Sequence, residues 1–120
     1  MVHSRRSSVK VWATAVLLSG LAGVAGAGQD AELQQSVARL GELNGIALAC
    51  KQNALATRLR EIMIETAPKQ RDVGEYFENA TNESFLAFGQ SGDDCPDGKT
   101  LAGQIEHARQ ALNRVMGIQS

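Results

Sequence analysis

The sequence has few of the residues from which catalytic and metal sites are usually built. Its 120 residues include two histidines, two cysteines and five aromatic side chains. Neither a G-x-G-x-x-G nor a G-x-x-x-x-G-K-[ST] pattern occurs, which excludes the usual phosphate-binding loops of nucleotide enzymes. A nucleophile also needs a neighbouring base and a group that orients the base, and no such set is present. We therefore expect a protein that is not an enzyme.

The two histidines do not change this expectation. His3 lies in the leader segment described below, which leaves His107 for the folded domain. On the helix predicted around it, His107 lies on the face opposite Leu101 and Leu112, and the domain has no second histidine for a metal site. The sequence predicts no catalytic residue, no metal site and no cofactor.

The N-terminus has the three parts of a secretory signal peptide. Arg5, Arg6 and Lys10 supply the positive charge, residues 11–24 form an apolar run, and the small residues 25–27 (Ala-Gly-Ala) form a cleavage site. The apolar run is shorter than the roughly 20 residues of a membrane-spanning helix. We expect residues 1–27 to be removed, without a stable membrane anchor.

Two export routes fit this leader. The stretch "SRRSSVK" resembles the twin-arginine export signal, but Ser8 stands where that signal usually has a large apolar residue. The other route is the general Sec pathway, which the sequence favours. No cysteine follows the cleavage site directly, so lipidation there is not expected. Both routes predict a periplasmic or secreted bacterial protein.

Removal of the leader gives an acidic domain without an obvious affinity for nucleic acid. Residues 28–120 hold 9 lysines and arginines against 13 aspartates and glutamates, a net charge of −4. A nucleic-acid-binding surface is typically basic. In an oxidising compartment, the pair Cys50 and Cys95 predicts one disulfide. The two cysteines are 45 positions apart, and closing a loop of that length stabilises a fold by about 4 kcal/mol in the chain-entropy model.

Apolar residues recur at helical spacing along the whole domain. Between residues 30 and 66 they form two neighbouring stripes, which fit either one long helix or two helices. Each glycine costs about 1 kcal/mol in a helix interior. The sequence therefore favours a break between Gly41 and Gly45, close to Gly45. The two stripes comprise Leu33, Val37, Leu40, Leu43, Ala47, Leu48, Leu55, Leu59 and Ile62.

Two further helices follow. Pro68 ends the first helical segment and can open a third helix over residues 69–88. Its predicted inner face comprises Val73, Phe77, Ala80, Ser84, Ala87 and Phe88. A loop over residues 89–98 leads to a last helix that Asp97 or Thr100 caps and Gly117 ends. The apolar stripe of the last helix comprises Leu101, Ile105, Ala108, Leu112, Val115 and Met116.

The predicted fold is all-α. Residues 28–120 form a single domain, a small bundle of three or four helices stapled by a Cys50–Cys95 disulfide. In its size, its cysteine spacing and the stretch "CPDGKTLAGQ", the chain bears a general resemblance to small periplasmic acid-stress chaperones and helical immunity proteins. No family motif supports the resemblance, so we assign no family.

Negative charge gathers in one part of the domain. Seven acidic residues and no lysine or arginine lie between positions 72 and 98. A calcium loop of the EF-hand type is one interpretation, but Cys95 and Gln104 occupy two of its ligand positions. A docking face for a basic partner is the second interpretation, and a merely solvated surface is the third.

The same region holds all four aromatic residues of the domain. Phe77 and Phe88 fit the core, whereas Tyr76, Phe85 and Leu86 are candidates for an exposed apolar surface. We expect a partner to contact Tyr76, Phe85, Leu86, Asp93 and Asp94.

The expected function is that of an exported helper that binds another protein, one with a basic surface, as an accessory subunit, an inhibitor or immunity protein, or a chaperone. The alternative is a carrier of a small ligand or metal ion, which would use the acidic loop or a cavity between helices. The sequence leaves the oligomeric state open.

The leader gives the first testable prediction. N-terminal sequencing of the exported protein should begin at Gly28, because the small-residue site precedes it. A mature mass that still includes Trp12 would contradict cleavage at this site. Export of the chain in Sec and twin-arginine mutant strains distinguishes the two routes.

Overall fold

The structure, a computed structural model, describes residues 30–118, and these residues form four helical segments and no strand. The segments are an N-terminal helix over residues 30–49, α2 (Asn53–Thr66), α3 (Arg71–Ser91) and α4 (Gly98–Met116). This confirms the predicted all-α bundle. The leader and its cleavage site lie outside the described residues. No helix in the described range is long and apolar enough to cross a membrane. The arrangement below concerns residues 32–118.

The first helical segment breaks at Cys50, Lys51 and Gln52, not at the predicted position near Gly45. Lys51 takes the left-handed conformation, with φ of 60°. The N–H of Gln52 then donates to the carbonyl of Ala47 at 2.8 Å, as in a helix C-terminal cap. This position is usually filled by glycine, so a lysine gave no sequence signal of the turn. The prediction of two helices is correct, and the predicted break point is wrong.

Gly41 and Gly45 lie inside the N-terminal helix, where they let α3 approach its backbone. A methyl group on Gly41 would lie 2.4 Å from the carbonyl oxygen of Phe77. One on Gly45 would lie 2.5 Å from the carbonyl oxygen of Thr81. The two glycines are one helical turn apart and therefore share a face. Their contacts advance together along both helices, so the N-terminal helix and α3 run parallel.

Hydrogen bonds join the same two helices beside the glycines. The side chain of Asn44 donates to the hydroxyl of Thr81 at 3.2 Å. The hydroxyl of Thr81 lies 2.8 Å from the carbonyl oxygen of Phe77 and 3.1 Å from that of Gly41. Both polar side chains are buried. Ser84 adds a third link by donating to the carbonyl of Glu42 at 2.7 Å.

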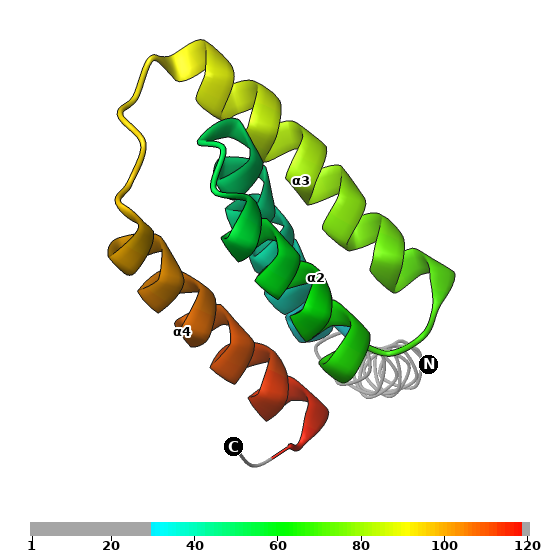
Figure 1. Ribbon diagram of the computed structural model, residues 1–120. Coiled ribbons are helices and arrows are strands. Elements are labelled where there is room, and N and C mark those ends of the chain that lie inside the picture. Colours follow the sequence, from blue (N-terminus) through cyan, green and yellow to red (C-terminus); the bar gives the residue numbers. More distant parts are fainter. Residues whose placement is uncertain (1–29, 119–120) are drawn as a thin grey trace, which may run out of the picture. The chain divides into compact units, whose positions relative to one another are not determined.

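The other two helices pack against each other and complete the core. α2 and α4 are in contact and run in the same direction, opposite to the N-terminal helix (cyan in Figure 1) and α3. All four segments contribute to one apolar core. Its buried side chains are Val37, Leu40, Leu43, Ala47, Ala56, Leu59, Ile62, Ala67, Val73, Phe77, Leu101, Ile105, Ala108 and Leu112.

The predicted helix faces are correct near the middle of the bundle and wrong towards its ends. On α4, Val115 is half-buried and Met116 is exposed. On α3, the predicted inner residue Ala87 is exposed and Phe88 is half-buried. The helix ends also differ: α3 begins at Arg71 after an extended Gln70, so Pro68 does not open it. It ends at Ser91 and is followed by Gly92, which is left-handed with φ of 74°.

The predicted disulfide between Cys50 and Cys95 is present, with the two Cα atoms 5.7 Å apart. It joins the end of the N-terminal helix to the loop before α4. A second link lies beside it, because the side-chain amide of Gln52 donates to the carbonyl of Pro96 at 2.9 Å. The break after the N-terminal helix and the loop after α3 are therefore held together at one end of the bundle.

The close approach of the two parallel helices gives a prediction about stability. Gly41→Ala and Gly45→Ala should each destabilise the fold, because overpacking against backbone atoms costs about 1–3 kcal/mol or more and outweighs a helix-propensity gain of about 1 kcal/mol. Urea denaturation with the disulfide intact measures the free energy of unfolding.

Gly103→Ala is the matched control for these two variants. Gly103 is helical, and a methyl group there would meet no atom within 4 Å. This substitution should stabilise the protein by about 0.5–1 kcal/mol. If Gly41→Ala and Gly45→Ala stabilise the protein as much as Gly103→Ala, the helices are not in tight contact at the glycines.

Candidate partner-binding face

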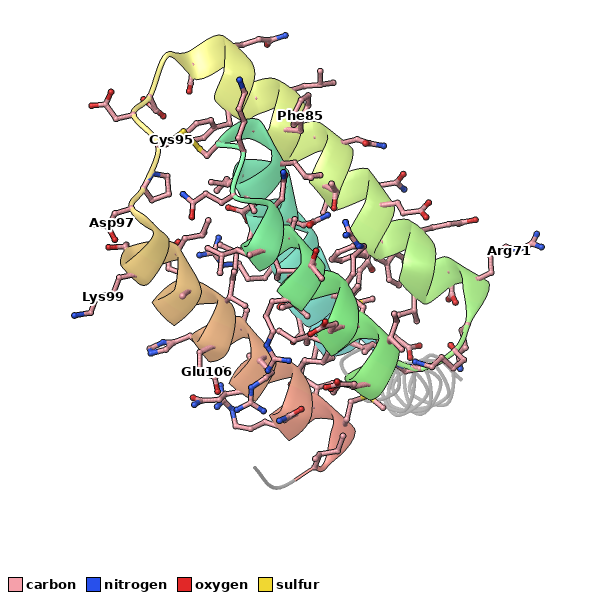
Figure 2. All side chains as sticks on the ribbon, viewed as in Figure 1. Arg71, Phe85, Cys95, Asp97, Lys99 and Glu106 are labelled. Atoms are coloured by element: carbon pink, nitrogen blue, oxygen red, sulfur yellow. A yellow bond between two sulfur atoms is a disulfide. The ribbon has the colours of Figure 1, made fainter. Side chains whose placement is uncertain are left out.

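Three large apolar side chains are exposed together at the disulfide end of the bundle. Leu48 of the N-terminal helix is 36% exposed, and Phe85 and Leu86 of α3 are 45% and 59% exposed. They line one hollow of about 390 Å³, together with Ala49, Lys51, Gly89 and Gln90. Figure 2 shows Phe85 at the same end of the bundle as Cys95 and Asp97, and Arg71 at the other end of α3. We call Leu48, Phe85 and Leu86 the apolar patch.

The apolar patch is exposed because the last part of α3 extends beyond the shared core. The buried residues of α3 are Val73, Phe77 and Thr81. After Thr81, α3 lies against the N-terminal helix through Gly45 and Ser84. Apolar side chains that point away from that contact therefore remain in solvent.

A second hollow runs along the other side of the contact between the N-terminal helix and α3. It has a volume of about 760 Å³, and we call it the helix groove. Its apolar lining includes Phe88, which the sequence assigned to the core. The lining residues are Gln35, Ala38, Arg39, Glu42, Ile46, Ala80, Glu83, Ser84, Ala87, Phe88, Ser91 and Asp93.

The acidic residues between positions 72 and 98 take no part in the ion pairs found among the described residues. Those pairs are Arg39–Glu42 at 2.8 Å, Arg58–Glu61 at 3.9 Å, and Glu106–Arg109. All three pairs lie on the N-terminal helix, α2 or α4. The carboxylates of Glu83 and Asp93 therefore leave negative charge along the helix groove, whereas the charged residue that lines the hollow of the apolar patch is Lys51.

The structure brings four of the five predicted contact residues to one end of the bundle. Phe85 and Leu86 belong to the apolar patch, Asp93 lines the helix groove, and Asp94 is exposed in the same loop. Tyr76 is separate from them. It is half-buried and packs against the core, and it precedes Phe85 by nine residues, a rise of about 14 Å along the helix.

Two parts of this face were missed by the sequence analysis. Leu48 was placed in a core stripe, and a cavity between helices was named only for the alternative ligand carrier and was not located. One signal for the groove was present: glycines four residues apart, as in Gly41 and Gly45, are typical of helices that approach closely. A close pair of helices leaves a furrow where its surface is not covered by the core, and the helix groove lies along such a furrow.

The remaining candidates of the sequence analysis do not converge on a second site. His107 is exposed on α4. Within residues 30–118, no group of three or more histidine, cysteine or acidic side chains is arranged to hold a metal ion. Comparisons of the chain with protein-family models, with curated proteins and with solved structures found no match.

One carboxylate of the acidic loop has a defined structural role. Asp97 precedes α4, and its side chain accepts a hydrogen bond of 2.7 Å from the backbone N–H of Thr100. This bond is the main reason that the pKa of Asp97 lies below its ordinary value, with a smaller contribution from the hydroxyl of Thr100. Asp97 therefore caps α4, which confirms the first of the two caps that the sequence offered.

The cap gives a prediction with a defined pH dependence. Because the folded-state pKa of Asp97 is lowered, its contribution to stability is present above the unfolded pKa of about 3.9 and is lost as the pH falls through the folded pKa. Asp97→Ala should lower the melting temperature at pH 7. The difference from the wild type should shrink when the pH falls below about 4.

Asp97→Asn is the control for this prediction. Asparagine caps a helix about as well as aspartate but does not titrate. Melting curves of the three proteins between pH 7 and pH 2.5 compare them. A gap between the wild type and Asp97→Ala that stays constant over this range would show that the ionised carboxylate does not act as the cap.

Proposed function

We propose that this protein is an exported, non-enzymatic helper that binds another protein through the disulfide end of its bundle. The exposure of Leu48, Phe85 and Leu86 on two adjoining helices carries the proposal. Contiguous apolar patches on soluble domains mark interaction sites. Aromatic side chains at the centre of such patches commonly supply most of the binding energy.

The carboxylates of α3 and the following loop support a protein partner with a basic surface, although the charged residue that lines the hollow of the apolar patch is Lys51. The carboxylates of α3 and the following loop are not neutralised by the ion pairs of the described residues. Unbalanced charge of this kind speeds the encounter with an oppositely charged partner, while apolar contacts slow the dissociation of the complex. Both properties occur towards the disulfide end of α3, where Glu83 lines the groove and Phe85 and Leu86 line the hollow of the apolar patch.

The disulfide supports export, because such bonds persist mainly in oxidising compartments. A small domain held by one disulfide and carrying one binding face suits an accessory subunit, an inhibitor or immunity protein, or a chaperone. Each of these roles needs the same face, and the identity of the partner distinguishes them.

Site-specific photo-crosslinking in the source organism tests the proposal. A benzophenone amino acid replaces Leu86 in the full-length chain, and the adducts are identified by mass spectrometry. Position 86 should give one predominant protein adduct. Phe85→Ser in the same chain should reduce that adduct to about a tenth or less, as expected when an aromatic anchor worth 2 kcal/mol or more is lost.

Position 102 is the matched control for position 86. Ala102 is exposed on α4, and it lines neither the apolar patch hollow nor the helix groove. A helical circular dichroism spectrum must be retained in each variant, which we expect because Phe85 and Leu86 lie outside the core. Equal and unspecific adducts at positions 86 and 102 would contradict the proposal.

A further inference from the structure

We propose that the helix groove receives an amphipathic helix of the partner, with apolar side chains on its inner face and lysine or arginine along its flanks. This inference rests on the proposed function and adds the secondary structure and charge of the segment that is bound. Its basis is the shape, lining and charge of the groove between the N-terminal helix and α3.

The dimensions of the groove suit a helix. Its walls are residues 35–46 of the N-terminal helix and residues 80–91 of α3. Each wall rises by about 16 Å, or three turns. The two walls run parallel and are drawn together at Gly41 and Gly45; they face each other where Ser84 meets Glu42, and each wall continues beyond that point in the opposite direction. Helix-in-groove recognition uses a furrow of this kind, with anchors on the bound helix spaced by three or four residues.

The lining allows close approach and offers apolar contacts. Ala38, Ala80 and Ala87 present only methyl groups, so a helix laid over them meets little obstruction. Ile46 and Phe88 are half-buried and supply larger apolar surfaces. An incoming helix would complete the burial of Phe88, a residue that the core leaves partly in solvent.

The rim of the groove determines the charge of the occupant. Four charged side chains line it, and Arg39 pairs with Glu42 at 2.8 Å. Glu83 and Asp93 take no part in the ion pairs of the described residues. Two carboxylates without a cation therefore border an apolar floor. The complementary segment is apolar in the middle and basic at its edges.

A synthetic peptide provides the direct test. The probe is a 14-residue helix-forming peptide with leucines on one face and lysines on its flanks, and its counterpart carries glutamates in place of the lysines. Binding to the full-length, disulfide-bonded protein is followed by calorimetry and by amide NMR shifts. The lysine peptide should bind and shift residues 80–91 and 35–46, and the glutamate peptide should not.

Charge reversal separates the groove from general acidity. Glu83→Lys together with Asp93→Lys should weaken binding of the lysine peptide by about tenfold or more, since two attractions become repulsions. Glu75→Lys together with Glu78→Lys makes the same change in net charge on exposed positions of the same region, outside the groove. This control pair should weaken binding by less than about threefold, because salt screens the attraction between the peptide and charges that lie outside the groove. Equal losses in both pairs would overturn the inference.

Photo-crosslinking of the natural partner separates this inference from the proposed function. The benzophenone amino acid is placed at position 87, which lines the groove, and compared with position 86 of the apolar patch. Adducts at both positions, with the position-87 adduct mapping to a basic helical segment, support the inference. An adduct at position 86 alone overturns the groove and leaves the proposed function standing. Absence of specific adducts at both positions overturns both.

Discussion

The contact between the backbones of the N-terminal helix and α3 is the constraint on which the rest of the structure depends. At Gly41 and Gly45, the space that a side chain would occupy is filled by carbonyl groups of α3. At so short a distance, polar groups of both helices meet directly, and Asn44, Thr81 and Ser84 bridge the two backbones. The side-chain oxygen of Asn44 is buried without a partner among the described residues. Burial of such a group carries a cost of about 1–3 kcal/mol, so the pairing must be stabilised by the contacts around it.

This contact also explains why the candidate partner-binding face lies where it does. α3 joins the core through its first half, and its second half is held by the N-terminal helix and by the loop that the disulfide fixes. Phe88 lines the groove along the contact of the two helices, and Phe85 and Leu86 line the separate hollow beside Leu48. The residues that stabilise the fold and the residues of the candidate partner-binding face are therefore largely separate sets.

The periodicity of the sequence was sufficient to predict the fold but not to locate the candidate partner-binding face. Helical spacing identified Val37, Leu40, Leu59, Leu101 and Leu112 as core, since such residues repeat on one side of a helix wherever the partner helix lies. The same rule misplaced Leu48, Ala87 and Phe88, because the stripe continues past the point where the bundle ends.

The break at Lys51 was hidden because a lysine took the left-handed position that glycine usually fills. Glycines were interpreted as breaks in a helix, although here they permit contact between helices. Charge and aromatic content drew attention to residues 72–98, whereas the location of the groove depended on a distance between helices that no local pattern encodes.

The distribution of ion pairs adds a last argument about the acidic surface. Where acids and bases lie on one helix three residues apart, as in Arg58–Glu61 and Glu106–Arg109, they pair locally. Such exposed pairs stabilise a fold by only about 0–1 kcal/mol, so pairing is not a requirement of stability. Because such pairs add so little, the fold does not depend on whether lysine or arginine is present between positions 72 and 98. The absence of these residues there is therefore not explained by stability. It also carries a small penalty, because like charges on neighbouring turns repel. A solubilising role alone would be served equally by acids spread over the surface, whereas Glu83 and Asp93 lie at the same end of the bundle as exposed Phe85. That coincidence favours recognition of a basic, apolar-centred partner over simple solvation.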